Sequence, residues 1–365
     1  PDVRVAPCPC DLPITPTLPS NAMLRTAFIS SALWRAQPLA ACRTYAWASN
    51  VARRAGPLDD GAPVGSGAST LVVSQGQTST CALPSDAWLA SMPRGAYTNA
   101  RTVKRDSVFE LDFHLERLSN SVKLMMFAEE VVVKGPGAPA ISTPEGLREL
   151  VLPELREALL QHRERNPDYA GEAKLALLVT WPPGEGAGGG ARAHVHVAPM
   201  GLPPSRPVKA MLAGSGRDNA AAKDSAWVAQ RMALEEDKPA DVNEVLLQDG
   251  QGRVLEGASS NFFAVVGGRL QTAGDGVLAG SLRRAVLEVC AARGVPVDLV
   301  APAAAEAGSW EGALLTSTAR LALPLDALLL PGGAGERAFP PDSLAHAVAA
   351  WVGEHVEASS QRVLP

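Results

Sequence analysis

The sequence predicts a mixed α/β (α+β) protein of two domains, and three observations lead to that prediction. Short apolar runs are separated by glycine-containing turns, a pattern typical of antiparallel hairpins. Other segments repeat apolar residues every three or four positions, as amphipathic helices do. Strands and helices do not alternate regularly, which argues against a doubly wound parallel sheet. The length of 365 residues suits two domains.

A proline-rich break at residues 201–207 divides the globular part of the chain. We expect a small N-terminal α/β domain over residues 86–200, a linker over residues 201–207 and a larger C-terminal domain over residues 208–365. Tight turns at residues 249–252 and 267–268 separate apolar runs in the C-terminal part, so antiparallel strands are expected there.

The N-terminal domain is expected to contain two helices and four strands. Leu115, Leu118 and Val122 recur at helical spacing, and Thr143 is a suitable N-cap for the second helix. A nearly continuous apolar run and a glycine-rich turn predict a hairpin after it. The helices are expected at residues 114–127 and 144–162, and the strands at residues 95–103, 107–113, 173–181 and 194–198.

The C-terminal domain follows the same reasoning, with apolar runs for strands and helical spacing for helices. Strands are expected at residues 208–213, 242–248, 253–256, 261–266 and 313–317, and helices at residues 219–235, 281–293 and 341–357.

The first 80 residues differ in composition from the rest. No Asp or Glu occurs from residue 12 to residue 58, whereas Arg, Ser, Thr and Ala are frequent. One interpretation is a transit peptide, which would place the protein in a plastid or mitochondrion. The other is a disordered or mistranslated extension, with the protein itself in the cytoplasm.

Composition argues against several classes of partner and site. The net charge of -5 and the absence of a long basic stripe argue against nucleic-acid binding and membrane-surface binding. The five cysteines fit no zinc framework, and no metal is expected. His194 and His196 alternate along a strand, so a half-exposed strand face explains them better than a metal does. Phosphate-loop, dinucleotide-binding and serine-hydrolase motifs are all missing from the sequence.

Two residues stand out as candidates for chemistry. Lysine is rare in this chain, and Lys223 follows three alanines, which would let a bulky cofactor approach the backbone. On spacing alone, a solvated helix lysine is the better explanation of Lys223. Glu256 ends a short strand in apolar company, so its carboxylate should be paired with another group.

The run from Lys223 to Asn261 resembles the signature region of class IV aminotransferases, the fold-type IV enzymes that use pyridoxal 5'-phosphate (PLP). The similarity lies in the pattern E-x-x-x-x-D-x-x-G-x-V-x-E-G-x-x-x-N-F, which begins at Glu244. Three further segments agree in order: residues 113–121 with the family's H-L-x-R-L-x-x-S helix, residues 276–283 with its phosphate loop, and residues 314–319 with its S-T-A segment.

This resemblance implies a role for each matching residue. Lys223 would be the Schiff-base lysine and the general acid and base, and Glu256 would bond the pyridine nitrogen. The PLP phosphate would be bound by the guanidinium of Arg117, by backbone N–H groups of Ser281 and Leu282 at a helix N-terminus, and by the Thr318 hydroxyl. The resemblance also implies a homodimer, with PLP between the two domains of each chain.

The substrate pocket departs from the family's patterns. Branched-chain members carry a Tyr five residues after the lysine, where this chain has Val228. D-amino-acid members end one strand with Arg-Gly, where this chain has Thr180-Trp-Pro. The strand with Tyr97 and Arg101 is similar to one in aminodeoxychorismate lyases. Tyr97, Arg101 and Thr180 are the candidate substrate residues, although Tyr97 would serve equally well as a core aromatic.

Three functions follow from the resemblance. The first is an aminotransferase acting on an amino acid and a 2-oxo acid. The second is a lyase that releases pyruvate from aminodeoxychorismate with the same cofactor. The third is a PLP-binding protein without useful turnover. The sequence does not decide between them, and it names neither the substrate nor its chirality.

Overall fold

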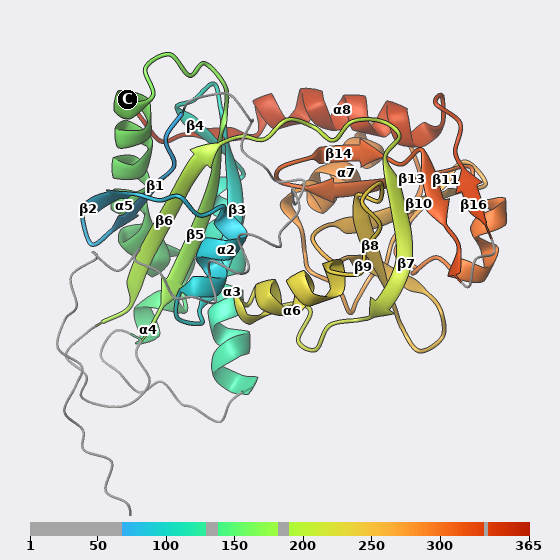
Figure 1. The fold of residues 1–365 in the computed structure, drawn as a ribbon, viewed down its shortest axis with the longest axis horizontal. Coiled ribbons are helices and arrows are strands. Elements are labelled where there is room, and N and C mark those ends of the chain that lie inside the picture. The colour runs from blue at the N-terminus through green and yellow to red at the C-terminus, as the bar shows by residue number, and fades with distance from the viewer. Residues whose placement is uncertain (1–67, 129–137, 182–189, 332–334) are drawn as a thin grey trace, which may run out of the picture. The chain divides into compact units, whose positions relative to one another are not determined.

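Antiparallel hairpins form the first of two sheets. The computed structural model describes residues 68–128, 138–181, 190–331 and 335–365. In it, this sheet has seven strands in the order β17-β4-β3-β5-β6-β1-β2. Figure 1 shows β1 to β6 gathered in one part of the fold. They are β1 (Leu71–Ser74), β2 (Gln77–Thr80), β3 (Ala96–Val103), β4 (Ser107–Phe109), β5 (Ala173–Thr180), β6 (Arg192–Pro199) and β17 (Ser360–Arg362). All of its pairings are antiparallel, so the predicted hairpin of β5 and β6 is confirmed.

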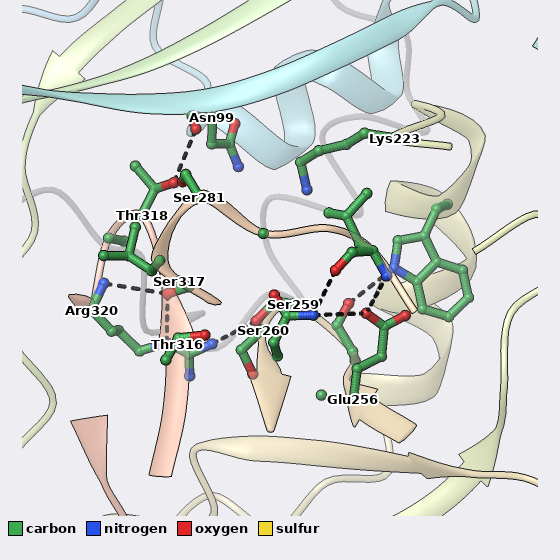
Figure 2. A pocket seen from close by; sticks show the side chains of 18 of the residues that line it. Asn99, Lys223, Glu256, Ser259, Ser260, Ser281, Thr316, Ser317, Thr318 and Arg320 are labelled. Carbon is green, nitrogen blue, oxygen red and sulfur yellow. Dashed lines mark hydrogen bonds between the residues drawn. The ribbon is translucent and has the colours of Figure 1, made fainter. Parts of the chain in front are cut away.

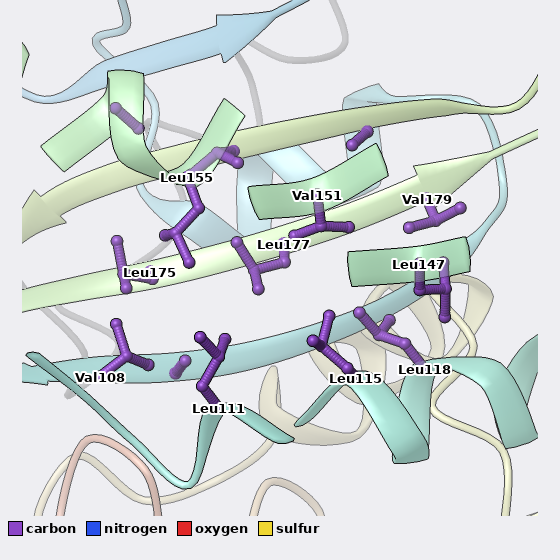
Figure 3. Close-up of a cluster of buried hydrophobic side chains, with 14 of the residues drawn as sticks. Val108, Leu111, Leu115, Leu118, Leu147, Val151, Leu155, Leu175, Leu177 and Val179 are labelled. Atoms are coloured by element: carbon purple, nitrogen blue, oxygen red, sulfur yellow. The ribbon is translucent and has the colours of Figure 1, made fainter. Parts of the chain in front are cut away.

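Two long helices cover one face of this sheet. They are α3 (Leu111–Ala128) and α5 (Pro144–Arg165), with the short α4 (Ala138–Ile141) before α5. Leu115 of α3 and Leu155 of α5 belong to one buried cluster with Leu177 of β5 (Figure 3). Burial of each such leucine stabilises the fold by roughly 1.5–3 kcal/mol. The hydroxyl of Thr143 accepts a hydrogen bond from the Gly146 N–H, which confirms the predicted N-cap.

Two shorter helices pack on the opposite face of the sheet, beside the candidate site. They are α2 (Ser85–Ser91) and α6 (Ala226–Glu235). Trp88 of α2 and Val228 of α6 share a buried cluster with Tyr97 of β3 and Leu178 of β5. This cluster fixes the position of Tyr97 on the sheet.

The second sheet combines antiparallel and parallel strands. Its order is β12-β11-β10-β9-β8-β7-β15-β16, and β13 pairs with both β10 and β14. Pairs β7–β8, β7–β15 and β11–β12 are parallel. The strands are β7 (Lys209–Ser215), β8 (Glu244–Gln248), β9 (Val254–Gly257), β10 (Asn261–Val266), β11 (Arg269–Gln271), β12 (Val297–Asp298), β13 (Gly312–Ser317), β14 (Leu321–Pro324), β15 (Ala327–Leu329) and β16 (Glu336–Ala338).

The second sheet has a buried cluster on each side. One forms between the sheet and the helices α7 (Ser281–Ala292) and α8 (Leu344–Ala358), and includes Phe263 and Val286. The other includes Phe262 and Trp310, which follows the 3-10 helix η1 (Ala304–Ser309). Alternate residues of β10 thus enter opposite clusters, as the two-residue period of a strand requires. Among the described residues, no helix has the length and apolarity needed to cross a membrane.

The structure changes two of the predicted boundaries. Residues 71–80 form β1 and β2, so the globular fold begins before the expected end of the leader at residue 80. The last strand, β17, belongs to the first sheet although it follows the second sheet in sequence. The division into domains at residues 201–207 stays a prediction. Residues 1–67 lie outside the described part of the chain, so the transit peptide and the compartment also stay predictions.

His194 and His196 lie on the same face of β6, as predicted, but that face is buried rather than half-exposed. His194 is hydrogen-bonded through Nδ1 to the Ser74 hydroxyl and through Nε2 to the Thr180 hydroxyl. His196 donates from Nε2 to the Leu83 carbonyl, and its ring lies 5.2 Å from that of Trp88. Burial lowers the pKa of each imidazole to about 4.

These buried rings predict that acid destabilises the fold. In the unfolded chain each ring binds a proton as the pH falls below its ordinary pKa of 6.5. In the folded chain it does so only near its lowered pKa of about 4. Stability is therefore lost as the pH falls through this window, by about 3 kcal/mol per ring. The measurement is the urea midpoint at about pH 7.5 and at about pH 4.5. His196→Gln should reduce the difference between the two midpoints, and His355→Gln, a change at a partly exposed ring, should not. Equal midpoints for the unaltered protein would contradict the prediction.

Candidate active site

One pocket collects most of the residues expected to carry chemistry. Its walls come from β3, α3, the segment before α6, the turn between β9 and β10, the start of α7 and the turn after β13. The space between these walls is about 750 Å³, and part of it is open to solvent. Seven of the predicted site residues line it: Tyr97, Arg117, Lys223, Glu256, Ser281, Leu282 and Thr318.

Lys223 is held at the edge of the first sheet by its backbone. Its carbonyl accepts the Tyr97 N–H at 2.9 Å, and its own N–H donates to the Ser121 hydroxyl at 3.0 Å. The residue precedes α6 instead of lying on the helix that was expected from residue 219, so that prediction was wrong. The backbone of this segment bonds to β3, and its side chain is thereby directed into the pocket (Figure 2).

The amine of Lys223 lies in a setting that favours its neutral form. Burial is the largest cause that lowers the pKa of Lys223 well below its ordinary value, and Arg117, Arg217 and Arg231 lower it further. The Nζ atom lies 4.6 Å from the centre of the Tyr97 ring. A buried neutral amine is both a nucleophile and a base.

Glu256 is paired with Arg217, as a buried carboxylate requires. Its Oε1 accepts hydrogen bonds from Nε and Nη2 of Arg217 at 2.8 and 2.7 Å, and its Oε2 accepts the Leu278 N–H at 3.1 Å. Burial raises the pKa of Glu256, and the charge of Arg217 acts in the opposite direction. The sequence indicated that Glu256 needs a partner, but nothing in it pointed to Arg217, which lies 39 positions earlier.

Arg117 is a buried cation with no carboxylate bound to it among the described residues. Its Nη1 donates to the Ala279 carbonyl at 3.1 Å, and its Nη2 donates to the Thr98 hydroxyl at 2.5 Å. Nδ1 of His114 lies 3.2 Å from Nη2. Nε has no hydrogen-bond partner in the described part of the chain. Burial lowers the pKa of Arg117 to about 10, so the group stays charged at neutral pH and would be stabilised by an anion.

The N-terminus of α7 lies beside Arg117, because the guanidinium bonds to Ala279 just before the helix. Gly280 is the N-cap and provides no side-chain cap, so backbone N–H groups of Ser281 and Leu282 are left for a ligand. A Cβ at Gly280 would lie 2.1 Å from Oδ1 of Asn261, which explains why glycine occupies this position. A helix N-terminus next to a buried arginine is a suitable site for a phosphate group.

Thr318 lies in the pocket wall, but its hydroxyl proton is already used. The hydroxyl donates to the Asn99 carbonyl at 2.9 Å, which links the turn after β13 to β3 (Figure 2). Bonding to a phosphate would require this hydroxyl to rotate. Its predicted role in phosphate binding therefore stays a prediction, and its observed role is to connect the two sheets.

Two of the candidate substrate residues do not line the pocket. Arg101 lies behind the turn after β13, with its Nη1 3.5 Å from the Thr318 carbonyl. Thr180 is hydrogen-bonded to His194 on the neighbouring strand. Tyr97 does line the pocket, under the amine of Lys223. The structure thus brings one of the three candidate substrate residues to the site.

Comparison with known proteins assigns the family. The amino-transferase class IV family matches residues 95–328, more than half of the chain. The chain therefore belongs to the class IV aminotransferase family, and the predicted family is confirmed. Membership supports an aminotransferase-type enzyme. A comparison with the curated proteins finds no match.

Solved structures share the fold, which confirms the predicted fold class. A branched-chain aminotransferase from Thermoproteus uzoniensis, solved with norvaline, is 20% identical, with a TM-score of 0.61 over 81% of this chain and 99% of that one. A hypothetical aminotransferase from Mycobacterium tuberculosis, solved with α-ketoglutarate and PMP, is 22% identical, with a TM-score of 0.59 over 79% of this chain and 99% of that one. A branched-chain amino acid aminotransferase from T.th., solved with 4-methylvaleric acid, is 20% identical, with a TM-score of 0.58 over 80% of this chain and 98% of that one.

Proposed function

We propose that this protein is a PLP-dependent aminotransferase that moves an amino group between an amino acid and a 2-oxo acid. The observation that carries the proposal is that the amine of Lys223, whose pKa burial lowers well below its ordinary value, lies in one pocket with a buried carboxylate and a buried cation. Family membership supports the proposal, and so does the Mycobacterium tuberculosis relative that was solved in a PLP-bound form.

The residues of the pocket fit PLP at three points. Arg117 and the N-terminus of α7 would hold the phosphate, because a buried guanidinium and the first N–H groups of a helix both favour an anion. Glu256 would hold the pyridine nitrogen, and Lys223 would hold the aldehyde carbon through its amine. When bound, PLP supplies an electron-withdrawing ring that stabilises negative charge at the α-carbon of an amino acid.

The protein's own groups would then move and hold protons. Burial lowers the pKa of Lys223 well below its ordinary value, so its Nζ atom would be suited to take the proton from the substrate's α-carbon and to return it to another carbon. Arg217 favours the ionised form of Glu256, and that carboxylate would keep a proton on the ring nitrogen of a bound cofactor. The Arg217–Glu256 pair is buried, which strengthens this interaction by limiting contact with water.

A lyase that releases pyruvate from aminodeoxychorismate is the second candidate. It is favoured by Tyr97, which lies on the strand similar to that of the lyases and lines the pocket under the Lys223 amine. Arg101 of the same strand gives less support, because it does not line the pocket. The two reactions would share the cofactor and the lysine, and they differ in whether a carbon–oxygen bond of the substrate is broken.

A product assay separates these functions. We expect the holoprotein to form glutamate from 2-oxoglutarate and an amino donor chosen from branched-chain and D-amino acids, with a matching change in the cofactor's visible absorbance. Pyruvate released from aminodeoxychorismate without any 2-oxo acid would favour the lyase instead. If neither an amino donor nor aminodeoxychorismate changes the absorbance of the bound cofactor, the protein binds the cofactor without turnover. Both enzymatic proposals would then be wrong.

A further inference from the structure

A second buried ion pair lies at the pocket, apart from the groups assigned above. Glu244 begins β8, and Arg320 lies in the turn between β13 and β14. The Nη2 atom of Arg320 lies 2.5 Å from Oε2 of Glu244, and their side chains are 7% and 1% exposed. Such low exposure means that each charge depends on the other, since removing one partner would leave an uncompensated charge inside the protein.

Glu244 also holds the turn between β9 and β10. Its Oε2 accepts hydrogen bonds from the hydroxyls of Ser259 and Ser260 at 2.8 and 2.9 Å, and its Oε1 accepts the Ser259 N–H at 3.3 Å. The carboxylate fills the space above Gly257, where a Cβ would lie 2.9 Å from Cδ of Glu244. Residues 257–260 form one wall of the pocket, so Glu244 fixes that wall from behind.

Arg320 holds the turn between β13 and β14 and joins it to the turn between β9 and β10. Its backbone N–H and its Nε both lie 3.3 Å from the Ser317 hydroxyl, and its Nη2 donates to the Ser259 hydroxyl at 2.6 Å. The next residue, Leu321, has a φ of 56°, a left-handed conformation that costs a side-chain-bearing residue about 1 kcal/mol or more. The contacts of Arg320 are placed to hold the turn in this strained form.

We propose that Glu244 and Arg320 are positioning residues that fix the two turns, residues 257–260 and 316–320, against each other and thereby set how tightly the pocket binds an organic-acid substrate. Both turns line the pocket, and Figure 2 shows Ser259, Ser260, Ser317 and Arg320 around the side opposite Lys223. The effect on substrate rests on the proposed aminotransferase function. The link between the turns rests on the contacts alone.

The first test compares amide hydrogen exchange in the two turns with exchange at the start of α7, where the phosphate is proposed to bind. In Arg320→Met, we expect amide hydrogen exchange to become about tenfold faster in peptides that cover residues 257–260 and 316–321 and to stay unchanged at residues 278–284. Arg320→Lys, which keeps a charge, should restore part of the protection. Arg253→Met is the matched control, because Arg253 is an exposed arginine that is paired with Asp249 and does not line the pocket.

Binding of a carboxylic acid tests the consequence for substrate. The probe is 4-methylvaleric acid, the compound solved with the branched-chain aminotransferase from T.th.. We expect its Kd for the holoprotein to rise about tenfold in Arg320→Met, with the amount of bound cofactor unchanged. If Arg320→Met does not fold, Glu244→Gln and Ser317→Ala, which each weaken the same links, provide the comparison.

The possible outcomes distinguish this proposal from the proposed function. Unchanged exchange in both turns overturns the positioning role, whatever the enzyme does. Faster exchange with an unchanged Kd overturns the link to substrate affinity. If the unaltered holoprotein does not bind the probe at all, the proposed function loses support, while the exchange data still decide whether the pair fixes the turns.

Discussion

The Lys223→Ala variant is expected to lose turnover by about 10⁴-fold or more while it keeps its fold. In the proposed function the amine at position 223 would have two tasks: it would hold the cofactor covalently, and it would move the proton at the substrate's α-carbon. No second amine in the described part of the chain has the same setting, with a pKa held well below its ordinary value beside a buried carboxylate. Steady-state rates with the amino donor identified by the product assay measure the loss.

Borohydride treatment followed by mass spectrometry tests the covalent role directly. Wild-type protein should gain the mass of one cofactor on the peptide that contains Lys223, and Lys223→Ala should gain none. Lys174→Ala is the matched control, because Lys174 is also a buried lysine of the pocket wall. It should retain cofactor fixation at Lys223. Cofactor fixed to the Lys223→Ala protein would show that another amine does this work.

The parts of the site that lie in local motifs were predictable from the sequence. Lys223, Glu256, Arg117 and the start of α7 each sit in a short pattern, and the structure brings all of them to one pocket. The residues that were missed act through distant partners. Arg217 contacts Glu256 because β7 and β9 flank β8 in the second sheet. The spacing of residues along the sequence does not show which strands become neighbours.

Tertiary contacts also explain where the secondary-structure predictions were wrong. The expected helix from residue 219 begins only at Ala226, because the Lys223 carbonyl and the Ser225 N–H bond to Tyr97 and Gly95 at the start of β3 instead of to helical partners four residues away. The strands at residues 71–80 were assigned to the leader, since they form a short hairpin whose link to the sheet, the pairing of β1 with β6, lies far along the sequence. The period of the strand placed Arg101 correctly on the face of Tyr97, but it could not show that the turn at Thr318 covers it.

Glu256→Gln is expected to lower turnover by about 10²–10³-fold and to weaken cofactor binding much less. An amide has nearly the same shape as the carboxylate, but it carries no charge and so cannot keep the ring nitrogen protonated. The phosphate contacts at Arg117 and α7 are untouched by the change, so most of the cofactor's affinity should remain. Rates at saturating donor, together with cofactor content after dialysis, give the comparison. Turnover equal to that of the wild type would remove Glu256 from its proposed role.

Arg217→Met provides the independent check, because it alters the ionisation of Glu256 without changing that residue. Burial raises the pKa of Glu256, and the charge of Arg217 is the main force that lowers it. Without Arg217 the pKa should rise further, so the carboxyl becomes protonated at neutral pH and activity falls there. Activity should then recover as the pH is raised, since deprotonation restores the charge, whereas Glu256→Gln has no proton to lose and should not recover. If both variants show the same pH profile, Arg217 acts through the shape of the pocket and not through the charge of Glu256.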